Sequence, residues 1–224
     1  MNISRNFRKT MSAIAVATSA FVLGASAASA SIVNIDLSGA VTGTSIVAPG
    51  GSFAQTFAGQ SVSGIDITGS PTNPLTLAPS GSITVAFFDP GVSAAANSLL
   101  PQPSNTAPLS LRLDSAADSL TWTMGFGNGG AIDVDLFGLN GALVNSTSFS
   151  GLSGYAVFSI SGLGTFHGLT FHNNTDAAGL RFMNFSYNSV TAPIPEPETY
   201  AMLLAGLGLL GFAARRRKLQ DAAA

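Results

Sequence analysis

Apolar and polar residues alternate one by one through the middle of the chain, and this pattern restricts those segments to strands with one buried face. In "LTWTMGF" (residues 120–126) the Leu, Trp, Met and Phe share one face and the two threonines lie opposite. The same alternation recurs in "AIDVDLF" (131–137) and "MNFSYNS" (183–189). Because successive side chains of a strand point to opposite faces of a sheet, we predict half-buried strands here.

Turn sequences separate these segments. Examples are Asp89-Pro90-Gly91 and "GNGG" (127–130), which supply the fixed or positive φ angles of chain reversals. The segment 97–109 contains three prolines and is predicted to be a loop. About ten strands at this spacing predict an all-β fold, a single antiparallel β-sandwich or jelly-roll domain. A β-helix is the lesser alternative, since no fixed repeat period is visible.

Residues 1–30 have the order of a secretory signal peptide. Basic residues between positions 5 and 9 precede an uncharged, mostly apolar run over 11–23, and small residues end at Ala28-Ser29-Ala30. We predict cleavage after Ala30, with Ala28 and Ala30 as the small residues of the cleavage site. An uncleaved N-terminal anchor is the alternative, but it requires roughly 20 apolar residues and a different flank.

Residues 31–192 have a usual size for one domain, and their charge is one-sided. They hold two arginines against eight aspartates, a net charge of −6, whereas the whole chain has −2. A surface this poor in basic residues cannot neutralise phosphates, so we expect no nucleic-acid partner. The chain has no cysteine, so an exported domain gains no disulfide stabilisation and relies on packing.

Few residues of the domain form a pattern that carries chemistry, and we expect no catalytic residue, no cofactor and no enzyme activity. Gly125, Gly127 and Gly130 match G-x-G-x-x-G, but a strand-like segment follows where a dinucleotide site needs a helix. Asp133 and Asp135 share one face of a predicted strand and are a weak candidate for calcium, which needs six to eight oxygens. We therefore favour a solvent-facing polar row and expect no metal.

Trp122 and the two histidines are the other residues that we considered for ligand binding. Trp122 suits a sugar-stacking platform, but its register with Leu120 and Met124 favours burial in the core. His167 and His172 lie five positions apart in an extended segment and therefore face opposite sides, so they do not jointly hold a metal.

The C-terminal tail consists of three ordered parts. Prolines at 193, 195 and 197 alternate and favour an extended, polyproline-like rod. An uncharged stretch over 200–214 would extend about 22 Å as a helix, short of the roughly 30 Å of a bilayer's hydrocarbon core. A basic cluster follows and would stay on the cytoplasmic side of the membrane. The signal peptide requires the same topology, with the β domain outside. The cluster consists of Arg215, Arg216, Arg217 and Lys218.

This tail resembles the PEP-CTERM sorting signal of bacterial exported proteins over 193–218. The resemblance implies that an exosortase, an integral membrane enzyme, recognises Pro195, Glu196 and Pro197 and removes the tail. The family's usual residue before this motif is valine, where this chain has Ile194. The resemblance also implies transient membrane contact through a C-terminal transmembrane helix and a cytoplasmic end at 219–224. It further implies frequent association with exopolysaccharide outside the cell.

These expectations favour an exported, non-enzymatic protein of the cell surface or the extracellular matrix. It would cross the inner membrane and be secreted or held at the surface after processing, with neutral strand faces that contact exopolysaccharide. One alternative is a glycan-active enzyme, which needs two carboxylates flanking a cleft at about 5–10 Å. Another is a permanently anchored surface protein, which would keep its tail.

Overall fold

The computed structural model describes residues 30–91, 94–104, 106–176, 179–190, 203–212 and 215. The chain divides into two compact units, one over Ala28–Pro193 and one that combines the two terminal segments, 1–27 and 194–224. The predicted signal peptide lies outside the described residues up to Ser29, whereas Ala30 is the first residue of a strand.

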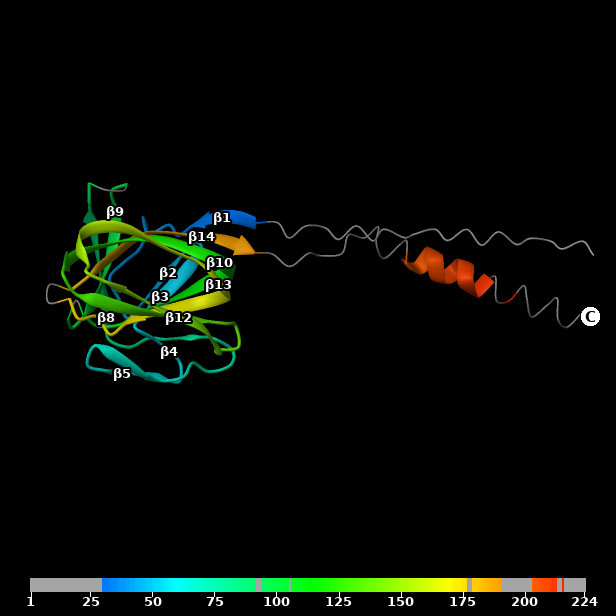
Figure 1. Ribbon diagram of the computed structural model, residues 1–224, viewed down its shortest axis with the longest axis horizontal. Helices are drawn as coiled ribbons and strands as arrows, with labels where there is room; N and C mark the ends of the chain where they lie inside the picture. Colours follow the sequence, from blue (N-terminus) through cyan, green and yellow to red (C-terminus); the bar gives the residue numbers. More distant parts are fainter. Residues whose placement is uncertain are drawn as a thin grey trace, which may run out of the picture. The chain divides into compact units, whose positions relative to one another are not determined.

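Every regular element that the structure describes in the larger unit is a strand (Figure 1). In chain order they are β1 (Ala30–Asn34), β2 (Ser45–Ala48), β3 (Gly51–Ala54), β4 (Thr56–Phe57), β5 (Gln60–Ser63), β6 (Asp66–Gly69), β7 (Leu77–Ala78), β8 (Ser82–Phe88), β9 (Ala96–Gln102), β10 (Leu109–Asn128), β11 (Ala131–Phe137), β12 (Leu143–Ser150), β13 (Ser153–His172) and β14 (Arg181–Val190). All their pairings are antiparallel, which confirms the predicted all-β, antiparallel class.

Two exceptionally long strands, β10 and β13, of 20 residues each, pair with one another and connect two layers. Their register breaks between Arg112 and Ala117, where β10 contributes extra residues, and again between Ala117 and Ser119, where β13 contributes them. Before the break β10 pairs with β3, and after it β10 pairs with β14. Interruptions of this kind are how a strand leaves one sheet and enters the other.

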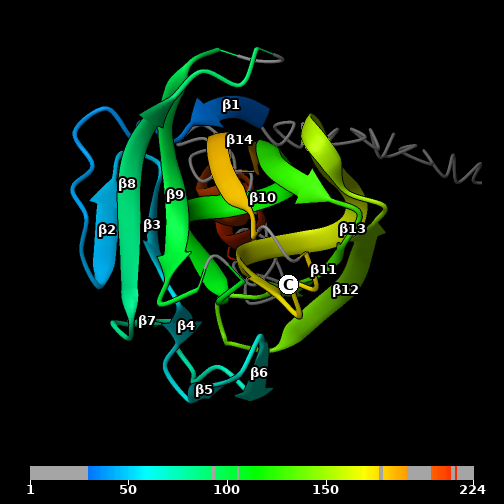
Figure 2. The same ribbon diagram turned by 90° about the vertical axis from the view of Figure 1, so that its left-hand side faces the viewer.

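We call the two parts the β3 layer and the β14 layer. The β3 layer has the order β12-β11-β13-β10-β3-β2, and the β14 layer has the order β13-β10-β14. The far edge of β14 is shared, because β9 pairs there at Phe182 and β1 pairs there over Ser186–Val190. Strand β8 then pairs with β9 along its length (Figure 2).

Aromatic rings from the two layers meet in one core. Phe171 of the β3 layer lies 4.7 Å, ring centre to ring centre, from Phe182 of the β14 layer. Trp122 is fully buried and packs edge-on against Phe149 and Phe171. Trp122 is therefore a core residue, as its register predicted, and does not offer a sugar-stacking surface.

A smaller apolar cluster covers the outer face of the β3 layer. Phe57 and Leu75, from the segment that holds β4 and β7, pack there with Phe137 of β11. Gly168 of β13 makes this approach possible, because a Cβ at that position would lie 2.7 Å from both Leu75 and Phe57. The segment 56–80 is thereby held across the sheet, and it carries the β5–β6 hairpin with it.

One predicted loop is a strand. β9 covers Ala96–Gln102 and includes Pro101, within the segment 97–109 that its prolines marked as a loop. The proline is tolerated because β14 pairs with β9 only at Leu99, so Pro101 is not needed as a donor towards β14.

In the terminal unit, residues 203–212 are helical and Arg215 is helical as well. No helix of the described residues has both the length and the apolar character that membrane crossing requires. The transmembrane helix expected over 200–214 stays a prediction, since 200–202 and 213–214 lie outside the described residues.

Replacing Phe171 with alanine tests whether the packing of the two layers stabilises the fold. We expect Phe171→Ala to lower the free energy of unfolding by about 3–5 kcal/mol, because it removes a buried ring that contacts both layers. The measurement is urea unfolding of the full chain, followed by the fluorescence of its single tryptophan. Val157→Ala on the same strand is the control, because Val157 is 53% exposed and should cost no more than about 0.5 kcal/mol. Equal losses in the two variants would contradict this role.

Candidate functional site

The two aspartates of β11 lie on the outer face of the β3 layer, and protein groups hold both. Asp133 accepts hydrogen bonds from the Ser148 hydroxyl at 2.6 Å and from the Asn173 amide at 2.8 Å. Asp135 accepts one from the Ser146 hydroxyl at 2.6 Å. The serines stand on β12 directly opposite the aspartates, so cross-strand pairing positions them.

His172 joins Asp135 to the β5–β6 hairpin. Its Nδ1 lies 2.6 Å from an Asp66 oxygen, and its Nε2 lies 3.3 Å from an Asp135 oxygen, an ion-pair contact outside hydrogen-bond geometry. The hairpin also contacts the end of β13 through the Asn173 N–H, which donates to the Ile65 carbonyl at 2.7 Å. We call Asp66, Asp135 and His172 the histidine clasp.

The charges of the clasp support one another. The Asp135 and Asp66 carboxylates raise the pKa of His172 against the opposing effect of its burial. Burial alone would raise the pKa of Asp135, but His172 and Ser146 outweigh it and lower that pKa. The Ile67 N–H and His172 lower the pKa of Asp66. The charged clasp is therefore favoured in mildly acidic solution.

Among the residues that the structure describes, no group of three or more His, Cys, Asp or Glu side chains has the arrangement of a metal site. The weak calcium candidate, Asp133 and Asp135, keeps its place on one strand face, and its oxygens are held by serine, asparagine and histidine. Sequence reasoning missed the clasp because Asp66 lies 106 residues from His172.

The clasp predicts a pH dependence of stability. A histidine with a raised pKa contributes stability that is complete below its unfolded value of about 6.5 and is lost as pH rises through the folded value. The lowered pKa values of the aspartates give stability that is lost as pH falls below about 4. We therefore expect the stability difference between wild type and His172→Gln to be larger at pH 5.5 than at pH 8.5 in urea unfolding. An identical difference at both values would show that the clasp carries no such linkage.

The glycine-rich turn between β10 and β11 is filled by the protein's own carboxylate. The N–H groups of Asn128 and Gly130 both donate to the carboxylate of Asp176, which is fully buried. A Cβ on Gly130 would lie 2.4 Å from the Asp176 backbone, so the glycine permits this approach. The G-x-G-x-x-G pattern is thus a turn that binds an internal anion.

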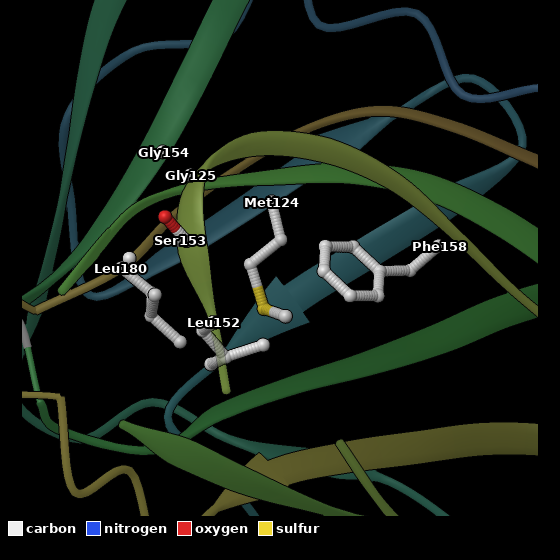
Figure 3. A pocket seen from close by; sticks show the side chains of 8 residues that line it. Met124, Gly125, Leu152, Ser153, Gly154, Phe158 and Leu180 are labelled. Atoms are coloured by element: carbon white, nitrogen blue, oxygen red, sulfur yellow. The ribbon is translucent and has the colours of Figure 1, made fainter. Parts of the chain in front are cut away.

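A gap beside this turn has a volume of only about 10 Å³ (Figure 3). Its walls are mostly apolar and include Met124, Leu152 and Leu180. A space of this volume admits one water at most, so it is a packing defect and no ligand site.

Asp176→Ala tests the turn. We expect a loss of about 2–3 kcal/mol in the free energy of unfolding, because two N–H groups lose a charged acceptor. Asp89→Ala is the matched control: Asp89 accepts from the Gly91 N–H in an exposed turn, and its loss should cost under about 1 kcal/mol. Urea unfolding of the full chain measures both. A cost for Asp176→Ala no greater than that of the control would contradict the role of the buried carboxylate.

A larger hollow opens where β1 and β9 diverge from the shared edge of β14. Its volume is about 510 Å³. We call it the edge groove, and it is lined by residues 34–38 after β1, by Phe87 of β8, by residues 95–97 and by Asn184 of β14.

The edge groove combines one exposed ring with several polar side chains. Phe87 is 72% exposed, and it stands opposite Asn97 in the β8–β9 pair. The adjacent Phe88 is half-buried and stacks on Tyr155 at 4.9 Å. The sequence held part of the signal for this: adjacent residues of a strand point to opposite faces, so the two rings of "FF" (87–88) had to lie on opposite sides. Alternation alone does not select Phe87 as the exposed ring, because Phe87 shares its face with the buried Ile83.

The residues of the sorting motif, Pro195, Glu196 and Pro197, lie outside the described residues, as do Ala28 and the basic residues 216–218. Arg215 is described and exposed. Their roles therefore rest on the sequence.

Comparison with family models identifies the tail. Residues 193–218 match the PEP-CTERM protein-sorting motif, which confirms the resemblance seen in the three ordered parts of that segment. The chain carries this bacterial sorting signal. Comparison with curated proteins found no match.

Several solved structures are similar to the β domain at low identity. A variant of the carbohydrate-binding module CBM29-2 is 12% identical, covering 72% of this chain and 92% of the module, with a TM-score of 0.35. A family 29 carbohydrate-binding module variant is 13% identical, covering 74% and 100%, with a TM-score of 0.36. An arabinose-bound GH51 α-L-arabinofuranosidase is 17% identical, covering 49% and 23%, with a TM-score of 0.33. TM-scores this low carry no argument about this chain.

Proposed function

We propose that this chain is an exported, non-enzymatic protein of the cell surface or the extracellular matrix that an exosortase processes and that associates with exopolysaccharide. The observation that carries the proposal is the PEP-CTERM motif over residues 193–218. A sorting signal that follows a β domain supports a role of the domain as the exported cargo and of the tail as the part that directs it.

The ends of the β domain suit processing on both sides. Ala30 and Val190 are direct partners in the β1–β14 pair, so the chain enters and leaves the domain at adjacent positions (Figure 1). Cleavage after Ala30 leaves Ser31–Asn34 paired with β14, and removal of the tail leaves β14 intact. We therefore expect the fold to tolerate the loss of both terminal segments.

The carboxylates support a non-enzymatic role. Glycoside hydrolysis requires two carboxyl groups on opposite sides of a cleft. Asp133 and Asp135 instead stand on one strand and are held by serine, asparagine and histidine side chains. Structural engagement of this kind favours a positioning role for these groups over proton transfer.

Replacing the sorting motif tests the proposal. We expect wild-type protein recovered from the medium to lack the segment after the Pro-Glu-Pro motif, as intact mass spectrometry would show. A variant with Pro195→Ala, Glu196→Ala and Pro197→Ala should stay with the cells and keep its full tail. Glu198→Gln is the matched control, because it removes a neighbouring acid outside the motif and should be processed normally.

Wild-type protein that keeps its entire tail in every fraction would contradict the proposal. That result would favour the permanently anchored surface protein.

A further inference from the structure

We propose that the edge groove binds a neutral, hydroxyl-rich polysaccharide chain, with Phe87 as the surface on which a sugar ring stacks. The inference rests on the proposed function, because it assigns the contact with exopolysaccharide to one site and one class of polymer. Four features of the groove carry it: fixed walls, an exposed ring, polar groups that accept hydrogen bonds, and negative charge.

The walls of the groove are fixed by one strand. β1 pairs with β14 over Ser186–Val190, and the Ile35 N–H extends this contact by donating to the Phe185 carbonyl at 2.9 Å. β9 pairs with the same edge at Phe182. Between them Asn184 has a backbone φ of 52°, a value that residues other than glycine adopt rarely. This irregularity separates the two walls, so the groove exists before a ligand arrives. Binding therefore loses little conformational entropy of the protein.

Phe87 gives the groove an apolar platform. Its ring is 72% exposed, whereas Phe88 is held between Tyr155 and the Arg181 guanidinium, each 4.9 Å from the Phe88 ring centre. The packing of Phe88 anchors the end of β8 and leaves the adjacent Phe87 exposed to solvent. A flat ring beside amide groups suits a pyranose, which presents a face of C–H bonds and a rim of hydroxyl groups, and such sites generally combine aromatic walls with a few placed polar groups.

The polar groups of the groove favour a ligand that donates hydrogen bonds. Asn97 directs its amide N–H to the Leu37 carbonyl at 2.7 Å, so the group that it has left for a ligand is its oxygen. Asp36 adds a carboxylate. Sugar hydroxyls are donors and fit such acceptors.

Charge disfavours an acidic polymer. The Ser38 N–H donates to Asp36 at 2.8 Å, and hydrogen bonds from Ser38 lower the pKa of this carboxyl, which keeps it ionised at neutral pH. The described residues that line the groove include no lysine or arginine. A carboxylated or sulfated chain would therefore meet negative charge with no cation to pair it, at some energetic cost.

The volume is adequate for a segment of chain. At about 510 Å³ the groove falls within the roughly 300–1,000 Å³ of small-molecule sites, whereas the gap beside the glycine turn, at about 10 Å³, does not. The groove is open to solvent, so a polymer can enter without threading an end.

Binding to defined polysaccharides tests the inference. The protein, as recovered from the producing cells, is compared in affinity gel electrophoresis on three neutral polymers (hydroxyethylcellulose, galactomannan, dextran), two acidic ones (alginate, polygalacturonate) and the producer's own exopolysaccharide. We expect retardation by at least one neutral polymer and none by the acidic ones. Phe87→Ala should weaken binding about tenfold or more, since stacking and area burial are both lost.

Two further variants make the result specific. Val47→Ala removes an exposed apolar side chain, 83% exposed on β2 and outside the groove lining, and should bind as wild type does. Asp36→Asn keeps an oxygen for the Ser38 N–H but removes the charge, so the ratio of alginate binding to neutral-polymer binding should rise above that of the wild type. Thermal unfolding of Phe87→Ala should match wild type, because the ring is largely exposed.

The outcomes separate this inference from the proposed function. Equal binding of the producer's polymer by wild type and Phe87→Ala would overturn the assignment of the groove and leave the association with exopolysaccharide standing. Binding of alginate as tight as that of the neutral polymers would overturn the charge argument. No binding to any polymer, the producer's own included, would overturn both the inference and the polysaccharide part of the proposed function.

Discussion

The packing of Phe171 against Trp122 and Phe182 joins the two layers of the β domain, and most other features of the fold depend on it. The ring comes from β13, one of the two 20-residue strands that run through both layers. Because the same two strands build each layer, the layers share a backbone as well as a core. A domain without disulfides gains its stability from this arrangement of buried rings, since the chain has no cysteine.

The long strands also decide what remains at the edges. With β10 paired to one edge of β14, the other edge is left for two short partners, β1 at one end and β9 at the other. The edge groove lies where these partners separate, and the adjacent ends of the domain, Ala30 and Val190, lie where β1 pairs with β14. The proposed binding site and the attachment points of both terminal segments are thus products of a single strand edge, built on a core that holds it in place.

Sequence reasoning predicted what local alternation controls and missed what distant contacts control. The alternation around Trp122 and Asp133 gave the strand faces correctly, because side-chain direction in a strand depends only on position. The prolines around Pro101 led to a wrong prediction of a loop. A proline disrupts a strand only where the neighbouring strand requires a backbone N–H at that position, and this depends on which residues pair. The histidine clasp and the Asp176 turn join residues that lie between 37 and 106 positions apart, and no spacing rule links them. The two adjacent rings of residues 87–88 predict one ring on each face, but the exposure of Phe87 was not predictable, because it shares its face with the buried Ile83.

Amide hydrogen exchange of β10 tests the central claim, that two layers share one core, most directly. The segments to compare are Leu109–Leu113, which lies in the β3 layer, and Leu120–Met124, which lies in the β14 layer. One shared core predicts that the buried amides of both segments exchange at similar slow rates, through opening of the whole domain. Fast exchange in one segment with strong protection in the other would show that the layers open independently and would contradict the account.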